Sequence, residues 1–206
     1  MTTRIVGRRF LITTGGIIGF LFVVLCFHFR SGSYSVSAAG RREDANGESI
    51  RSFAAVASVL TSPRCVNCHI SGDSPLQGDE SVPHNMNVKR GLDGRGTPAM
   101  RCANCHQSEN SSIPHAPPGA PDWRLPLPSV RMAWQGLSFG DLCRTLKDPT
   151  KNGGRSLSQL LDHFESEPLV LWAWNPGLGR IPAPLSHDEF VAKVKQWIET
   201  GAACAQ

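Results

Sequence analysis

Two five-residue strings constrain this chain more than any other feature: Cys-Val-Asn-Cys-His at residues 65–69 and Cys-Ala-Asn-Cys-His at residues 102–106. Two thiols separated by two residues lie on one side of a tight turn, where they can form thioethers with the two vinyl groups of one porphyrin. The histidine that follows then lies beneath the ring and offers its imidazole to the iron. The pattern is typical of covalent haem attachment, and its two copies predict two haem c groups.

Each cysteine and histidine of the two strings has an expected role. The thioethers are assigned to Cys65, Cys68, Cys102 and Cys105, and the proximal iron ligands to His69 and His106. Two other uses of such cysteine pairs are less favoured. Structural zinc usually takes pairs about 15–20 residues apart, whereas these pairs lie 37 residues apart. A thioredoxin-like redox motif needs a βαβ context, which the surrounding glycine, proline and asparagine runs do not supply.

The chain is also poor in core-forming residues for its 206-residue length. Glycine and proline together make 35 residues, and aromatic residues make only 7%. Two porphyrins would add large apolar faces against which short segments can pack. Haem is therefore expected to be part of the fold as well as of the function, and the five tryptophans are expected to pack beside the porphyrins and fill gaps in the core.

The N-terminal region has the pattern of a membrane-targeting segment. The stretch from Phe10 to Phe29 has only His28 as a potential charge, and three arginines precede it. A helix of about 20 residues spans the roughly 30 Å hydrocarbon layer, and the arginines predict a cytoplasmic N-terminus. A retained inner-membrane anchor is favoured over a cleaved signal peptide because the apolar run exceeds the usual 7–15 residues. Either outcome predicts a bacterial periplasmic location for the rest of the chain.

The distribution of charge excludes one class of partner. Six of the 21 basic residues precede residue 43, whereas all 17 acidic residues lie from Glu43 onward. The remainder therefore carries 15 basic and 17 acidic side chains, for a net charge of −2. Nucleic-acid binding requires a basic patch, so it has no support.

Helical patterns and loops alternate along the rest of the chain. Helices are predicted at residues 49–61, 138–147, 157–166 and 187–200, the last three with serine caps at Ser138, Ser156 and Ser186. Residues 71–100 and 111–128 are rich in glycine and proline and predict long loops draped on haem. The predicted fold class is mainly α with long irregular loops, a dihaem cytochrome c-like domain behind an N-terminal transmembrane helix. The predicted parts are a signal anchor or signal peptide (1–30), a linker (31–48) and the dihaem domain (49–206).

The remaining cysteines suggest a cross-link. Cys26 lies in the apolar N-terminal stretch, and the two motifs account for four more, which leaves Cys143 and Cys204. In an oxidising compartment, two cysteines left over in this way predict a disulfide between them. This bond would tie the last helix to the helix at 138–147. The alternative is two unpaired buried thiols.

The distal ligands of the two irons decide what the haems can do. His84 follows Pro83 in the loop between the motifs, and His163 lies at the edge of an apolar helical stripe, so these two are the predicted distal ligands. Paired histidines predict low-spin haems of relatively low potential. The less favoured alternatives are His115, His187, Met86 and Met132.

With both motifs in place, the chain resembles multihaem c-type cytochromes of the bacterial periplasm. The runs Lys-Asp-Pro at 147–149, Asn-Gly-Gly-Arg at 152–155, Leu-Trp-Ala-Trp-Asn-Pro-Gly at 171–177 and Thr-Gly-Ala-Ala-Cys at 200–204 are similar to small dihaem proteins labelled isoquinoline 1-oxidoreductase subunits. The resemblance covers roughly residues 50–206. It implies an electron-accepting partner of a periplasmic dehydrogenase, such as a molybdenum hydroxylase, that passes electrons to another redox protein of the respiratory chain.

The expected function is therefore electron transfer without an enzymatic activity of its own. The alternative is a small dihaem enzyme, a peroxidase or nitrogen-oxide reductase, with one open iron site. The two differ in whether a side chain closes the sixth position of each iron.

Overall fold

A computed structural model of the chain describes residues 37–206. The predicted membrane segment at residues 10–29 and the whole predicted N-terminal part (1–30) lie outside the described residues, as do the first residues (31–36) of the predicted linker. Within residues 37–206, no helix is both long enough and apolar enough to cross a membrane.

The predicted fold class is wrong, because the described part is a mixed structure in which short strands accompany the helices. Strand β1 (Leu76–Gln77) pairs antiparallel with β2 (Val82–Pro83), and β3 (Gly96–Thr97) pairs antiparallel with β4 (Met100–Arg101). Each hairpin occupies part of the region predicted as one long loop. Two-residue strands are too short to produce the apolar–polar alternation by which strands are recognised in a sequence.

The first helix, α1 (Ala38–Leu60), begins well before the predicted start at residue 49. Ser37 caps it, since its side chain accepts a hydrogen bond from the backbone N–H of Gly40 at 3.1 Å. The first half of α1 is polar and exposed, and only its second half packs on other elements. Because an exposed helical stretch has no apolar stripe, periodicity could not identify it.

The three serine-capped helices are present where the sequence predicts them. They are α3 (Phe139–Lys147), α4 (Leu157–Ser166) and α6 (His187–Glu199), preceded by Ser138, Ser156 and Ser186. Both α4 and α6 begin with a capping box, in which the serine hydroxyl and the third residue of the helix satisfy each other's backbone N–H groups. The other helical elements are single turns: α2 (Pro63–Val66), η1 (Asn85–Asn87), η2 (Cys102–Asn104), α5 (Pro168–Leu171) and η3 (Trp172–Trp174).

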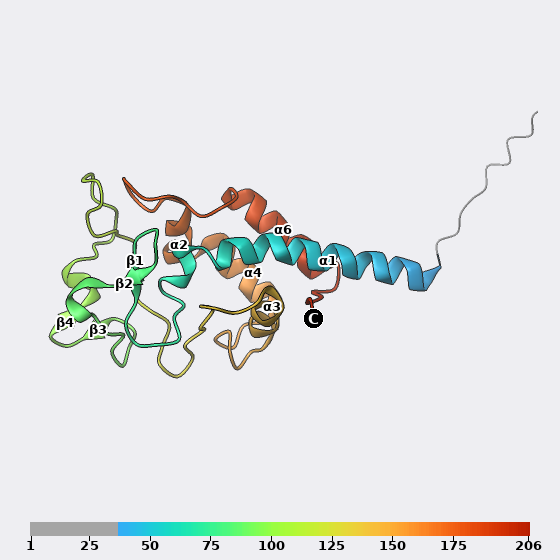
Figure 1. Cartoon of the computed structure of the whole chain (residues 1–206), viewed down its shortest axis with the longest axis horizontal. Coiled ribbons are helices and arrows are strands. Elements are labelled where there is room, and N and C mark those ends of the chain that lie inside the picture. The colour runs from blue at the N-terminus through green and yellow to red at the C-terminus, as the bar shows by residue number, and fades with distance from the viewer. Residues whose placement is uncertain (1–36) are drawn as a thin grey trace, which may run out of the picture. The chain divides into compact units, whose positions relative to one another are not determined.

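The hydrophobic core lies where α1, α3, α4 and α6 meet (Figure 1). Phe53 of α1 and Trp197 of α6 contact each other with ring centroids 4.8 Å apart, and Phe164 of α4 meets Phe190 of α6 edge-on at 5.2 Å. Leu142 of α3 is fully buried in the same cluster. The strands lie together in the green part of the ribbon in Figure 1. Ion pairs such as Arg64–Asp79, Arg95–Asp122 and Arg101–Asp93 lie in this region.

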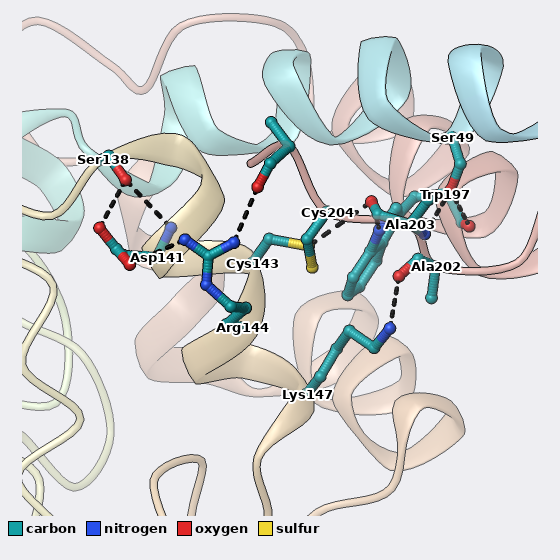
Figure 2. Close-up of a disulfide and its surroundings, with 11 residues drawn as sticks. Ser49, Ser138, Asp141, Cys143, Arg144, Lys147, Trp197, Ala202, Ala203 and Cys204 are labelled. Atoms are coloured by element: carbon teal, nitrogen blue, oxygen red, sulfur yellow. Dashed lines mark hydrogen bonds and ion pairs between the residues drawn. A yellow bond between two sulfur atoms is a disulfide. The ribbon is translucent and has the colours of Figure 1, made fainter.

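A disulfide between Cys143 of α3 and Cys204 fastens the C-terminal segment to the core (Figure 2). It closes a loop of 61 residues, which in the chain-entropy account stabilises a fold by about 4 kcal/mol. Ser49 of α1 supports the same segment, because its hydroxyl donates to the Trp197 carbonyl at 3.0 Å and accepts from the Ala203 N–H at 2.9 Å. Lys147 donates to the Ala202 carbonyl at 2.7 Å. This scaffold holds the elements that line the first of two cavities.

Candidate cofactor sites

The first motif forms a single turn that gathers its three functional side chains. Pro63 begins α2, and the carbonyl of Cys65 accepts from the N–H groups of Cys68 (3.1 Å) and His69 (3.0 Å). Cys65, Cys68 and His69 all line one cavity. Two sulfurs and one imidazole at a single cavity are the groups that covalent attachment of a haem would use.

The second motif repeats that turn. The carbonyl of Cys102 accepts from the N–H groups of Cys105 (3.1 Å) and His106 (2.9 Å), and η2 takes the place of α2. His106 lines a second cavity, together with Ala103 of the same turn. Cys105 is exposed. The same local sequence thus gives the same local backbone in two different surroundings.

Both proximal histidines are fixed by a backbone carbonyl. Nδ1 of His69 donates to the Met132 carbonyl at 2.9 Å, and Nδ1 of His106 donates to the Pro118 carbonyl at 2.7 Å. Because a carbonyl can only accept, each hydrogen bond places the ring proton on Nδ1 and leaves the Nε2 lone pair for a metal. Histidines that bind metals are commonly oriented in this way.

A tryptophan ring also lies flat against each proximal histidine. Trp134 stacks on His69 with ring centroids 3.4 Å apart and planes 1° apart, and Trp123 stacks on His106 at 4.4 Å and 6°. These contacts restrict rotation of the imidazoles about their side-chain bonds. No sequence pattern assigns a particular tryptophan to a particular histidine.

Burial keeps both proximal imidazoles neutral near pH 7. Loss of water lowers the pKa of His69 to about 4 and also lowers the pKa of His106. Metal binding requires the neutral ring. The pKa values of the first pair of thiols move the other way: burial raises the pKa of Cys65 to about 12 and that of Cys68 to about 11. Redox-active cysteine pairs have lowered thiol pKa values, so this environment does not suit a thioredoxin-like pair.

The first cavity brings His69 and His163 together. Both histidines line it. His163 comes from α4, and its Nδ1 lies 3.9 Å from Oε2 of Glu167. Most of the remaining lining is apolar, and it comes from α1, α5, η3, α6 and the loop at residues 123–134. A mainly apolar cavity with an imidazole from the motif and another from α4 has the chemistry that a porphyrin would need.

The second motif has its own histidine partner. The ring centroids of His84 and His106 lie 6.2 Å apart. Two metal–imidazole bonds of about 2.0–2.1 Å, with about 1.1 Å from each nitrogen to its ring centroid, give a separation of about 6.3 Å for two axial ligands of one metal. Nδ1 of His84 donates to the Asn85 carbonyl at 2.8 Å, which leaves Nε2 as the lone-pair nitrogen. The spacing therefore fits axial ligation by this pair.

The β1–β2 hairpin that precedes His84 is attached to the first motif. The N–H of Leu76 donates to the Asn67 carbonyl at 2.9 Å, and the buried guanidinium of Arg64 pairs with Asp79 at 2.6 Å. The N–H of His84 itself donates to the Pro75 carbonyl at 3.0 Å. The first motif therefore supports the segment that presents His84 to the second motif.

The alternative ligands have other surroundings. His187 is held by a hydrogen bond between its Nε2 and the Phe164 carbonyl at 2.9 Å, His115 packs against Gly179, and Met86 is 69% exposed. Neither His187, His115 nor Met86 lines either cavity. Met132 does line the first cavity, where its carbonyl holds His69.

Arginines at the first cavity match the acidic groups of haem. Arg64, Arg124 and Arg155 line it beside a single carboxylate, Glu167. Arg64 pairs with Asp79 and Arg124 with Asp122, whereas Arg155 forms no ion pair within residues 37–206. The two propionates of a haem would meet a surplus of guanidinium groups, which bind carboxylates well. Nothing in the sequence singled out these arginines, because basic residues are spread along the whole chain.

Other metal sites are absent from the part of the chain that the structure describes, where no group of three or more His, Cys, Asp or Glu side chains could hold a metal ion. A haem iron differs in that the protein supplies only its axial ligands.

Scans of the chain against protein-family models, curated proteins and solved structures find no match.

Proposed function

We propose that this chain is an electron-transfer protein that carries two covalently attached c-type haems. The observation that carries the proposal is the pairing of histidines at both motifs: His106 with His84 at 6.2 Å between ring centroids, and His69 with His163 among the residues that line one cavity. Haem supplies one-electron chemistry when it is bound. The chain's own residues attach it, fix its axial imidazoles and exclude water.

The histidine pairs favour a carrier over an enzyme. An iron whose sixth position is closed by a side chain has no place for a small substrate, whereas peroxidases and nitrogen-oxide reductases need an open or weakly held position. His84 and His163 are the groups proposed to close the two positions. His69 and His106 hold the opposite faces through Nε2, since Nδ1 of each is engaged by a carbonyl.

The proposed location is the bacterial periplasm. Disulfides persist in that oxidising compartment, and the Cys143–Cys204 bond suits it. The resemblance of residues 50–206 to dihaem subunits of periplasmic oxidoreductases supports an electron donor of the dehydrogenase class, with a molybdenum hydroxylase as the specific proposal, and an acceptor in the respiratory chain.

Spectra of the purified, oxidised protein test this function. A carrier with two histidine-ligated haems gives only low-spin ferric signals by electron paramagnetic resonance, and its reduced visible spectrum does not change on exposure to carbon monoxide. A high-spin ferric signal, or carbon monoxide binding to one haem in the untreated protein, would contradict the carrier and support the enzymatic alternative.

A further inference from the structure

Trp123 occupies a special place relative to the two candidate sites. Of all the described residues, it alone lines both cavities. On one side its ring stacks on His106, the proximal ligand proposed for the second haem, with centroids 4.4 Å apart and planes 6° apart. The side chain is half-buried. It therefore lies between the first cavity and the imidazole of the second motif.

The other neighbour of Trp123 is a second tryptophan. Trp172 of η3 lines the first cavity and meets Trp123 edge-on, with ring centroids 5.0 Å apart and planes 85° apart. An unbroken set of ring contacts thus runs from His106 through Trp123 and Trp172 to the first cavity. No other set of aromatic contacts joins the two cavities within residues 37–206.

Both tryptophans are held in place by their neighbours. Nε1 of Trp172 donates to Oδ1 of Asn110 at 3.2 Å, and the guanidinium of Arg64 lies 5.5 Å from the Trp172 ring centroid, in the range of a cation–π contact. Trp123 is confined between Trp172 and His106. Because each ring is held on two sides, the distance between the Trp123 and Trp172 rings stays constant. A loosely packed side chain at a cavity edge would not keep such a distance.

We propose that Trp123 is a positioning residue shared by the two haem sites and that, with Trp172, it forms the contact through which an electron passes between them. The inference rests on the proposed function. In this step one electron leaves a ferrous haem, which becomes ferric, and reduces the other haem from ferric to ferrous. No bond is made or broken and no proton moves.

The physical basis is the filling of space between the sites. Electron transfer between buried centres slows steeply as through-space gaps replace packed atoms. An aromatic ring in contact with the imidazole of one site and with the wall of the other leaves no gap on this route. Replacing Trp123 with a smaller aliphatic side chain would open a gap on this route. It would also free the His106 ring from its stacking partner.

The test measures electron redistribution between the haems after photochemical reduction by a single electron, in the full chain with both haems attached. Trp123→Leu is expected to slow this redistribution severalfold and to shift the low-spin resonance signal of the second haem. Trp172→Leu is expected to slow it as well, without that shift, because it does not touch His106. Phe139→Leu, at an exposed aromatic residue outside both cavities, is the matched control and keeps the rate of the unaltered protein.

A rate within twofold of the unaltered protein in both tryptophan variants would overturn the proposal. If Trp123→Leu fails to retain its second haem, the redistribution rates of Trp123→Phe and Trp172→Leu are measured instead. Rates within twofold of the unaltered protein in both would likewise overturn the proposal. The proposed function fails in a separate way, since a chain without two covalent haems would have no such redistribution to measure.

Discussion

The two candidate sites share one five-residue motif and one backbone turn but lie in different surroundings. The first is walled by helices of the core and by apolar side chains, and its thiols and imidazole have strongly shifted pKa values. Beside the second motif, the cavity that His106 lines is walled by hairpin and loop residues, among them Arg95, Arg101 and Asp122. Neither cysteine of the motif lines this cavity, and Cys105 is exposed. The motif therefore gives both sites the same turn, while the rest of the chain sets the polarity and the solvent access of each.

This difference suggests unequal roles for the two sites. A haem in the second site would have an exposed edge, which suits exchange of electrons with a partner protein. A haem in the first site would be shielded, with cationic side chains at its border. Both burial and positive charge favour the reduced form of a haem iron. We therefore expect the first haem to have the higher reduction potential.

The largest effects are expected from the two distal histidines, and each should affect one site only. His163→Ala removes an imidazole from the first cavity, and His84→Ala removes the ring that lies 6.2 Å from His106. Each variant should convert one haem from low to high spin and leave the other unchanged. Electron paramagnetic resonance of the oxidised proteins measures this directly.

His187, which is half-buried, is hydrogen-bonded to the Phe164 carbonyl and lines neither cavity, provides the control for these substitutions. His187→Ala should keep two low-spin haems. Two low-spin haems in both the His84 and His163 variants would show that the distal assignment is wrong.

Substitution of Gly119 should damage the second site more than the first. A Cβ at this position would collide with the carbonyl oxygen of Glu109 and lie 2.7 Å from that of Gln107. The shift needed to relieve this would displace Pro118, whose carbonyl holds His106. Gly119→Ala should cost about 1–3 kcal/mol in the free energy of unfolding and perturb the signal of the second haem, as urea titration and paramagnetic resonance can measure.

Gly72→Ala is the matched control, because a Cβ there would meet no atom within 4 Å. Its free energy of unfolding should stay close to that of the unaltered protein. Equal effects of the two substitutions would show that the close approach at Gly119 does not support the second site.

The unpaired arginine at the first cavity should set the potential of that site. A positive charge disfavours the ferric state, so Arg155→Gln should lower the potential of the first haem. A charge about 10 Å away at an effective dielectric of about 20 contributes roughly 1–2 kcal/mol, or tens of millivolts. Redox titration followed by paramagnetic resonance resolves the two haems, with Arg51→Gln on the exposed face of α1 as the control. An equal shift of both haems would contradict this placement of Arg155.

The smallest effect is expected at the surface of the second site, where Arg101 pairs with Asp93 at 2.6 Å. Hydrogen bonding by Arg101 lowers the pKa of Asp93 to about 2, below its ordinary value of 3.8. The carboxylate therefore contributes stability that is fully present above about pH 4 and is lost as the pH falls toward 2. Asp93→Asn should remove this part of the acid dependence, as thermal melts from pH 5 to 2 can measure, and a solvent-exposed pair should contribute little.

The sequence predicted those parts of the molecule that depend on side-chain identity. The caps at Ser138, Ser156 and Ser186 are correct because a hydroxyl before an apolar stripe has a specific physical role. Counting the cysteines left over by the motifs indicated the pair, Cys143 and Cys204, that the structure has bonded. Spacing also indicated that the two thiols and the imidazole of a motif would gather, and Cys65, Cys68 and His69 of the first motif line one cavity.

The parts that the sequence did not predict depend on the backbone or on very short elements. Every residue has a carbonyl, so nothing marked those of Met132 and Pro118 as the ones that hold the imidazoles. The β1–β2 hairpin that leads to His84 has strands of two residues and no readable alternation. The pairing of Trp134 with His69 and of Trp123 with His106 depends on how the loops return to the motifs.

Covalent attachment of a haem at both motifs can be measured as the mass of the denatured, full-length protein. The polypeptide, produced in a periplasm with a functional haem-attachment system, should retain two haem masses after denaturation and solvent extraction. Cys65→Ser with Cys68→Ser should remove one of them, and Cys102→Ser with Cys105→Ser should remove the other. Recovery of the bare polypeptide mass from the unaltered chain would contradict covalent attachment.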